Sequence, residues 1–232
     1  MEELLPASRV DGPAEGQEKY SLINKPEDAP KRYREHPLFD ALVKDPAHNN
    51  KPNGKTVREA MSIIEAELSH AVTGPVSRPE ADNPYIDFYD GEGHPFDVKT
   101  PVSSSFVQNR GPFMPWKISA SVLGQLDKHS PNALTGEQEQ VCVLLDTSYL
   151  TKEDYAAMWG QLRADTKDNP ELLARVYEVN VQLDDKTPVK QRLSLNPARL
   201  AQTAAALREN AERKTETKPS LAHLLRNKIQ GR

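Results

Sequence analysis

The chain has 232 residues, of which 37% are hydrophobic, and its formal net charge at pH 7 is −4. This apolar content is low, so we expect part of the chain to lie outside any packed core. The sequence holds no apolar run of transmembrane length, and its acidic N-terminus does not read as a secretory signal peptide. A single cysteine, Cys142, excludes disulfide frameworks and cysteine-based zinc sites within one chain.

Charge is distributed unevenly along the chain. Residues 186–232 hold 11 Lys/Arg and 3 Asp/Glu, whereas residues 1–185 hold 19 and 31. A basic segment behind an acidic body favours contact with an anionic partner such as nucleic acid, and it fits a solvated helical face equally well.

Three regions follow from the pattern of prolines and apolar residues. Residues 1–52 contain seven prolines and little periodicity, apart from a short amphipathic stretch at 36–45. We therefore expect a Pro-rich N-terminal arm or linker there. Residues 53–185 have the pattern of a folded core, and residues 186–232 that of a basic helical C-terminal segment.

The core pattern opens with a helix over residues 55–72, in which apolar residues recur every three or four positions. Thr56 and Glu59 have the spacing of a capping box at its start. A loop at 74–84 then leads to two expected strands, at 85–89 and 95–100, and a second loop follows at 102–115. The next expected elements are a helix at 116–130, a strand at 139–148, a helix at 151–166 with an N-cap at or near Thr151, and a strand at 174–183. Two further helices are expected at 196–214 and 220–229. This order predicts an α/β (α+β) core, a mixed sheet flanked by helices, with a helical C-terminal extension.

The stretch YIDFYDGEGHPFDVKTP, residues 85–101, carries the chemistry. Asp97 and Lys99 project to one face of their strand, and Asp87 faces them from the neighbouring strand. Two close carboxylates repel unless a cation lies between them, and hard oxygen ligands suit Mg²⁺ or Mn²⁺. A lysine beside such an ion can stabilise negative charge or orient an attacking water. The alternative is an edge salt bridge, although the apolar neighbours, Val98 among them, make unpaired charge costly here.

This arrangement resembles the PD-(D/E)XK nuclease superfamily. The resemblance implies a restriction-endonuclease-like core in which Asp87 and Asp97 bind the metal and Lys99 is catalytic. The sequence departs from the literal Pro-Asp motif, because Pro84 precedes Tyr85 and not the aspartate.

A narrower resemblance covers about residues 57–130. This part of the chain is similar to C-terminal nuclease domains of bacterial polymorphic toxins, including contact-dependent growth inhibition toxins. The matching residues are Gly74, Pro75, Val76, Arg78, Ile86, Asp87, Phe96, Asp97, Val98 and Lys99.

Members of the superfamily often add a glutamate from the first helix to the metal site. Glu65 and Glu67 lie at opposite borders of the apolar helix face. We favour Glu67, seven residues before Gly74, and keep Glu65 as the alternative. Glu59 lies on the far side of that face, and we assign it to the helix cap.

Four further residues are weaker candidates. His94 adjoins the hairpin and either touches a phosphate or is an exposed turn residue. Arg78 either binds phosphate or holds its loop. Lys117 and Gln125 lie on the second helix, which in this superfamily often faces the substrate.

The expected function is that of a metal-dependent endonuclease, using Mg²⁺ or Mn²⁺ to hydrolyse the phosphodiester bonds of DNA or RNA. The resemblance implies a bacterial toxin or effector with a cognate immunity protein. Such a protein acts in the cytoplasm of the producing or target cell, or is secreted as part of a larger toxin. The alternatives are a restriction or DNA-repair endonuclease of the same fold and an inactive nuclease-like binding module.

Overall fold

The computed structural model describes residues 21–46, 49–79, 85–107 and 111–186. All of them belong to the first of the two units into which the chain divides, residues 1–194. The basic segment expected at 186–232, with its two helices, lies outside the described residues except for Lys186.

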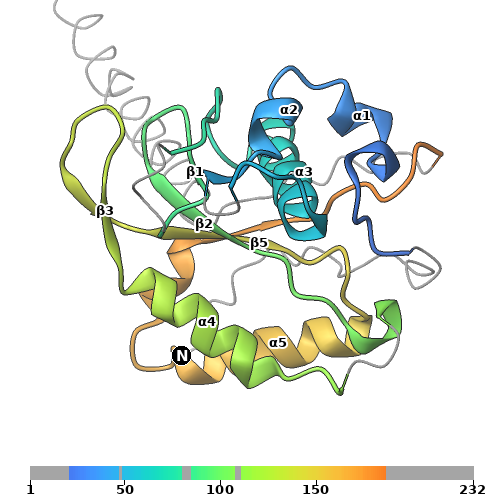
Figure 1. Ribbon diagram of the computed structural model, residues 1–232. Helices are drawn as coiled ribbons and strands as arrows, with labels where there is room; N and C mark the ends of the chain where they lie inside the picture. The colour runs from blue at the N-terminus through green and yellow to red at the C-terminus, as the bar shows by residue number, and fades with distance from the viewer. Residues whose placement is uncertain (1–20, 47–48, 80–84, 108–110, 187–232) are drawn as a thin grey trace, which may run out of the picture. The chain divides into compact units, whose positions relative to one another are not determined.

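A four-stranded mixed sheet lies at the centre of this unit, in the order β1-β2-β5-β6 (Figure 1). Its strands are β1 (Phe88–Tyr89), β2 (Pro95–Lys99), β5 (Cys142–Asp146) and β6 (Val176–Val179). β1 pairs antiparallel with β2, whereas β2 with β5 and β5 with β6 are parallel. A single bridge from Ser77 to Tyr89 extends the sheet beyond β1.

Two helical layers cover the faces of the sheet (Figure 1). One layer holds α1 (Lys31–Arg34), α2 (Phe39–Leu42) and α3 (Gly54–Leu68), and the other holds α4 (Pro115–Leu126) and α5 (Lys152–Asp165). Short 3-10 helices lie at Pro26–Asp28, Ser104–Phe106 and Pro170–Arg175. The expected mixed sheet flanked by helices is therefore confirmed. Within the described part of the chain, none of the helices has the length and apolar character needed to cross a membrane.

The strand expected over 139–148 is in fact two strands. β4 (Gln138–Gln140) pairs antiparallel with β3 (His129–Pro131) in a separate two-stranded sheet, and β5 begins at Cys142. The apolar residues of β5 are buried on both faces of the sheet, since Val143 and Leu145 pack with α4 and α5 while Leu144 packs with α3. The two strands differ in their distant pairing partners: β4 pairs with β3, whereas β5 pairs with β2 and β6.

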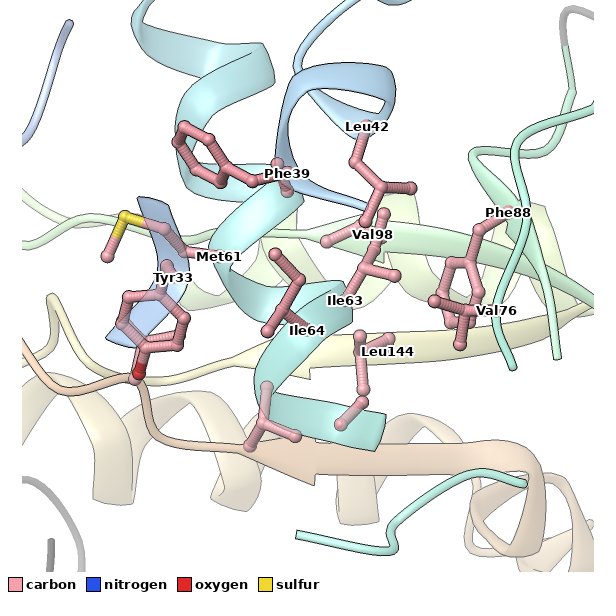
Figure 2. Close-up of a cluster of buried hydrophobic side chains, with 14 of the residues drawn as sticks. Tyr33, Phe39, Leu42, Met61, Ile63, Ile64, Val76, Phe88, Val98 and Leu144 are labelled. Atoms are coloured by element: carbon pink, nitrogen blue, oxygen red, sulfur yellow. The ribbon is translucent and has the colours of Figure 1, made fainter. Parts of the chain in front are cut away.

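The N-terminal segment, residues 21–46, is part of the core. Tyr33, Phe39 and Leu42 are at most 2% exposed and lie against α3, as Figure 2 shows. An arm or linker was expected over residues 1–52, and its described part is instead packed structure. The prolines indicated an arm or linker, but two of them lie at the starts of helices. Pro26 opens a 3-10 helix, and Pro30 precedes α1.

The cap of α3 also differs from the prediction. Asn53 is the N-cap, and its Oδ1 accepts hydrogen bonds from the backbone N–H groups of Lys55 (2.8 Å) and Thr56 (3.2 Å). The Thr56 hydroxyl accepts one from the backbone N–H of Asn53 (3.0 Å), which completes a capping box. Glu59 is therefore not part of the cap and lies in the body of the helix. At α5 the predicted N-cap Thr151 is confirmed, because its hydroxyl accepts from Asp154 N (3.1 Å).

Candidate active site

Asp87 is fixed at the end of the β1–β2 hairpin by its backbone and by its side chain. Its backbone N–H donates to the carbonyl of Phe96 (2.7 Å), and its Oδ2 accepts from the backbone N–H of Val98 (2.7 Å). The carboxylate thus takes the place of a strand carbonyl just before the two-residue strand β1 begins at Phe88. This geometry holds one carboxylate oxygen at the edge of β2.

Asp97 and Lys99 lie on the face of β2 opposite Phe96 and Val98, because side chains alternate along a strand. Lys99 Nζ is 2.5 Å from Asp97 Oδ2, and the two side chains are 22% and 9% exposed. Burial raises the pKa of Asp97, and the Asp87 carboxylate raises it further, so that it lies at about 6 although Lys99 opposes both effects. The hairpin therefore brings together the three residues predicted from the sequence, and the aspartate–lysine pair is largely enclosed.

Glu59 supplies a carboxyl group to this site from α3. Its side chain is 1% exposed, with Oε1 3.0 Å from Lys55 Nζ. Its Oε2 has no hydrogen-bond partner among the described residues. Burial and the nearby Asp87 carboxylate raise the pKa of Glu59, and Lys55 opposes them; the resulting pKa is about 7. One carboxylate oxygen from each of Asp45, Glu59 and Asp87 lies within 4.8 Å of the others.

Glu67, the helix residue favoured from the sequence, and Glu65, the alternative, lie elsewhere. Glu65 accepts a hydrogen bond from the Tyr33 hydroxyl (2.8 Å) and forms an ion pair with Arg32 (3.1 Å). Glu67 packs so closely on Gly74 that a Cβ there would lie 2.6 Å from its Oε1. It is two turns, or about 12 Å, further along the helix than Glu59, which is too far for the two to share one ion. The helix carboxyl group beside Asp87 is therefore that of Glu59.

The reason for this difference is the burial of α3. Glu59 was assigned to the helix cap on the side away from the apolar face, but α1 and α2 also pack on α3, and Glu59 and Ile63 are 1% and 0% exposed. Leu68, placed on the apolar face by periodicity, is 38% exposed. A helix packed between two layers cannot be divided into core and solvent faces by periodicity alone.

Arg78 fastens the N-terminal segment to the hairpin. Its Nε (2.9 Å) and Nη2 donate to the carbonyl of Leu42, and its Nη1 donates to the carbonyl of Asp87 (3.0 Å). The same Nη1 lies 4.0 Å from Asp87 Oδ1. Of the two roles considered for Arg78, these contacts fit the structural one.

His94 joins the hairpin turn to β4. Its Nδ1 lies 2.7 Å from Glu139 Oε2, and its Nε2 lies 3.4 Å from Glu92 Oε2. Burial lowers the pKa of His94, but its hydrogen bond to Glu139 and the nearby charges of Asp90, Glu139 and Glu92 outweigh that effect and raise it. Asp90, Glu92 and His94 form a second group with metal-ligand spacing, in which Asp90 Oδ1 already accepts two backbone N–H groups.

The two candidates on α4 lie at different depths. Lys117 is exposed near the start of the helix, with Nζ 5.4 Å from the ring centroid of Trp116. Gln125 is partly buried, and its Oε1 has no hydrogen-bond partner among the described residues.

Comparisons of the chain with protein-family models, with curated proteins and with solved structures found no match. The chemistry of the site is therefore inferred from its own residues: three carboxyl groups and a lysine at one edge of a sheet.

Proposed function

We propose that this protein is a metal-dependent nuclease that hydrolyses phosphodiester bonds. One observation carries the proposal: Asp87, Asp97 and Lys99 meet at one end of the hairpin, beside the buried Glu59 with its unpartnered oxygen. Carboxyl groups held together away from water are costly unless a cation or protons neutralise them.

The oxygen donors fit Mg²⁺ or Mn²⁺, which prefer carboxylates and retain several waters. Glu59 and Asp87 would hold such an ion, with Asp97 next to them. When bound, the ion supplies Lewis acidity and lowers the pKa of a coordinated water.

Lys99 has a separate part in the proposed reaction. Phosphodiester hydrolysis develops negative charge on the phosphoryl oxygens, and a pre-positioned ammonium group stabilises that charge. Asp97 fixes the position of Lys99 through their 2.5 Å ion pair. Asp87, in turn, is kept in place by its bond to Val98 N.

The order of the elements also supports a PD-(D/E)XK type of nuclease. Along the chain, α3 is followed by the bridge at Ser77, the β1–β2 hairpin, α4 and β5, which is parallel to β2. This order parallels the helix–strand–strand–strand–helix–strand core of that superfamily.

The toxin or effector role, with a cognate immunity protein as partner, rests on the narrower resemblance around Gly74 to Lys99. Expression of the wild-type chain in bacteria should stop growth, and Lys99→Ala should not. Growth inhibition that persists in a folded Lys99→Ala protein would contradict a toxic nuclease activity at this site.

A cleavage assay tests the proposed activity. The purified chain is incubated with plasmid DNA or total tRNA in Mg²⁺, Mn²⁺ or EDTA, beside Asp97→Ala, Lys99→Ala and the exposed control Lys167→Ala. We expect cleavage of one substrate that needs the metal, is lost in the first two variants and is kept in the control. Cleavage retained by folded Lys99→Ala would refute the proposal.

A further inference from the structure

A fourth carboxyl group reaches the site from outside the helix–strand core. Asp45 follows α2 at the end of the N-terminal segment and is 6% exposed. Its backbone carbonyl accepts from Asn50 N (3.0 Å), which fixes the turn that carries it. Two other carboxyl groups, those of Glu59 and Asp87, lie close to it.

The spacing of the three oxygens fits a single cation. An octahedral ion with ligands at about 2.1 Å sets neighbouring oxygens about 3.0 Å apart and opposite ones about 4.2 Å apart. One oxygen each from Asp45, Glu59 and Asp87 lies within 4.8 Å of the other two. Only small side-chain movements would close these oxygens around an ion.

An unpartnered buried atom points independently to a ligand at this place. Glu59 is 1% exposed, and its Oε2 has no hydrogen-bond partner among the described residues. The neighbouring basic groups are engaged elsewhere: Lys55 contacts Oε1, and Arg78 donates to the carbonyls of Leu42 and Asp87. A carboxylate oxygen left in this state costs free energy that a bound cation would recover.

We infer that Asp45 is a ligand of the divalent cation and that the N-terminal segment thereby completes the metal site. This inference rests on the proposed function, because it concerns the ion that the nuclease would use. The three protein ligands then come from three segments: the turn after α2, the second turn of α3, and the start of the hairpin. Arg78 positions two of them by bonding to the carbonyls of Leu42 and Asp87.

The test is the affinity of the full chain for Mn²⁺, measured by electron paramagnetic resonance of the free ion. Asp45→Asn removes the charge at nearly constant shape, and Asp40→Asn is the matched control, since Asp40 is exposed on α2 in the same segment. We expect Asp45→Asn to raise the Kd for Mn²⁺ at least about 10-fold, as loss of a direct ligand should. Asp40→Asn should bind like the wild type.

Thermal unfolding in EDTA separates ligand loss from misfolding. A cooperative unfolding transition of Asp45→Asn in EDTA shows that the variant is folded, so that a weaker Mn²⁺ affinity then reports the loss of a ligand. Unchanged Mn²⁺ affinity in Asp45→Asn, or a wild type that binds no Mn²⁺ at millimolar concentration, would overturn the inference. If wild type binds Mn²⁺ through Asp45 but cleaves no nucleic acid, the site stands and the nuclease proposal fails. If Asp45→Asn binds Mn²⁺ and cleaves nucleic acid like the wild type, the assignment of Asp45 as a ligand fails and the nuclease proposal stands.

Discussion

Glu59 is an acid enclosed by protein and surrounded by other acids. Its pKa of about 7 means that the metal-free protein holds much of it protonated near neutral pH. The pKa of Asp97, about 6, is raised for the same main reason, burial. Both groups bind protons more tightly in the folded state than in the unfolded chain, so their ionisation opposes folding.

The free energy of unfolding in EDTA should therefore fall as the pH rises from about 4.5 to above 7. Below the unfolded pKa both states hold the proton, and above the folded pKa the full cost of ionisation is felt. Urea unfolding at several pH values measures this, and Glu59→Gln should flatten the slope. A wild-type stability that rises across this window would contradict the assigned environment of Glu59.

Lys99 should matter for catalysis and little for metal binding. Lys99→Met removes the charge that stabilises the reacting phosphate, so the single-turnover cleavage rate should drop at least about 100-fold. Mn²⁺ affinity should change only a few-fold, because Lys99 is not a ligand and its loss leaves Asp97 free to turn toward the ion. A Lys99→Met protein with a near-normal cleavage rate would remove this residue from the mechanism.

At the scale of single elements, several local signals were read correctly from the sequence, although the cap of α3 was not, and the pairing partners of individual strands could not be read from it. Neighbouring residues were enough to predict the N-cap Thr151 and the hairpin that contains Gly93. Gly93 has a φ of +82°, a backbone conformation that favours glycine. The boundary between β4 and β5 depends on which distant strand each one pairs with. Glu59 was missed because α1 and α2 pack on the same helix. The prolines of residues 1–52 had led to the prediction of an arm or linker there instead of helices.

The packing of the N-terminal segment on α3 gives a stability prediction. Leu42 is 1% exposed, so Leu42→Ala should lower the free energy of unfolding by about 2–5 kcal/mol through lost burial and the cavity it leaves. Leu134 is 72% exposed, and Leu134→Ala should change stability by less than about 0.5 kcal/mol. Equal, small effects of the two substitutions in urea unfolding would mean that the segment is not part of the cooperative core.

At the scale of the whole molecule, the proposed nuclease activity would require the chain to attract a polyanion despite the net negative charge of residues 1–185. The sequence places its positive charge at 186–232, with 11 basic against 3 acidic residues. Replacing Arg213, Lys214 and Lys218 by serine should raise KM several-fold at low salt and leave kcat unchanged, because fewer counterions are released on binding. Steady-state cleavage at two salt concentrations measures this, and an unchanged KM would assign the attraction to other basic residues of the chain.

The most direct test of the proposed site compares Glu59→Gln with Glu67→Gln in nucleic-acid cleavage with Mn²⁺. Both changes replace a glutamate of α3 by its neutral isostere, and only Glu59 lies beside Asp87. We predict a loss of at least about 100-fold in cleavage rate for Glu59→Gln, as expected when an ion-binding carboxylate is removed, and a change of only a few-fold for Glu67→Gln. A severe loss for Glu67→Gln with activity retained by Glu59→Gln would contradict the site described here.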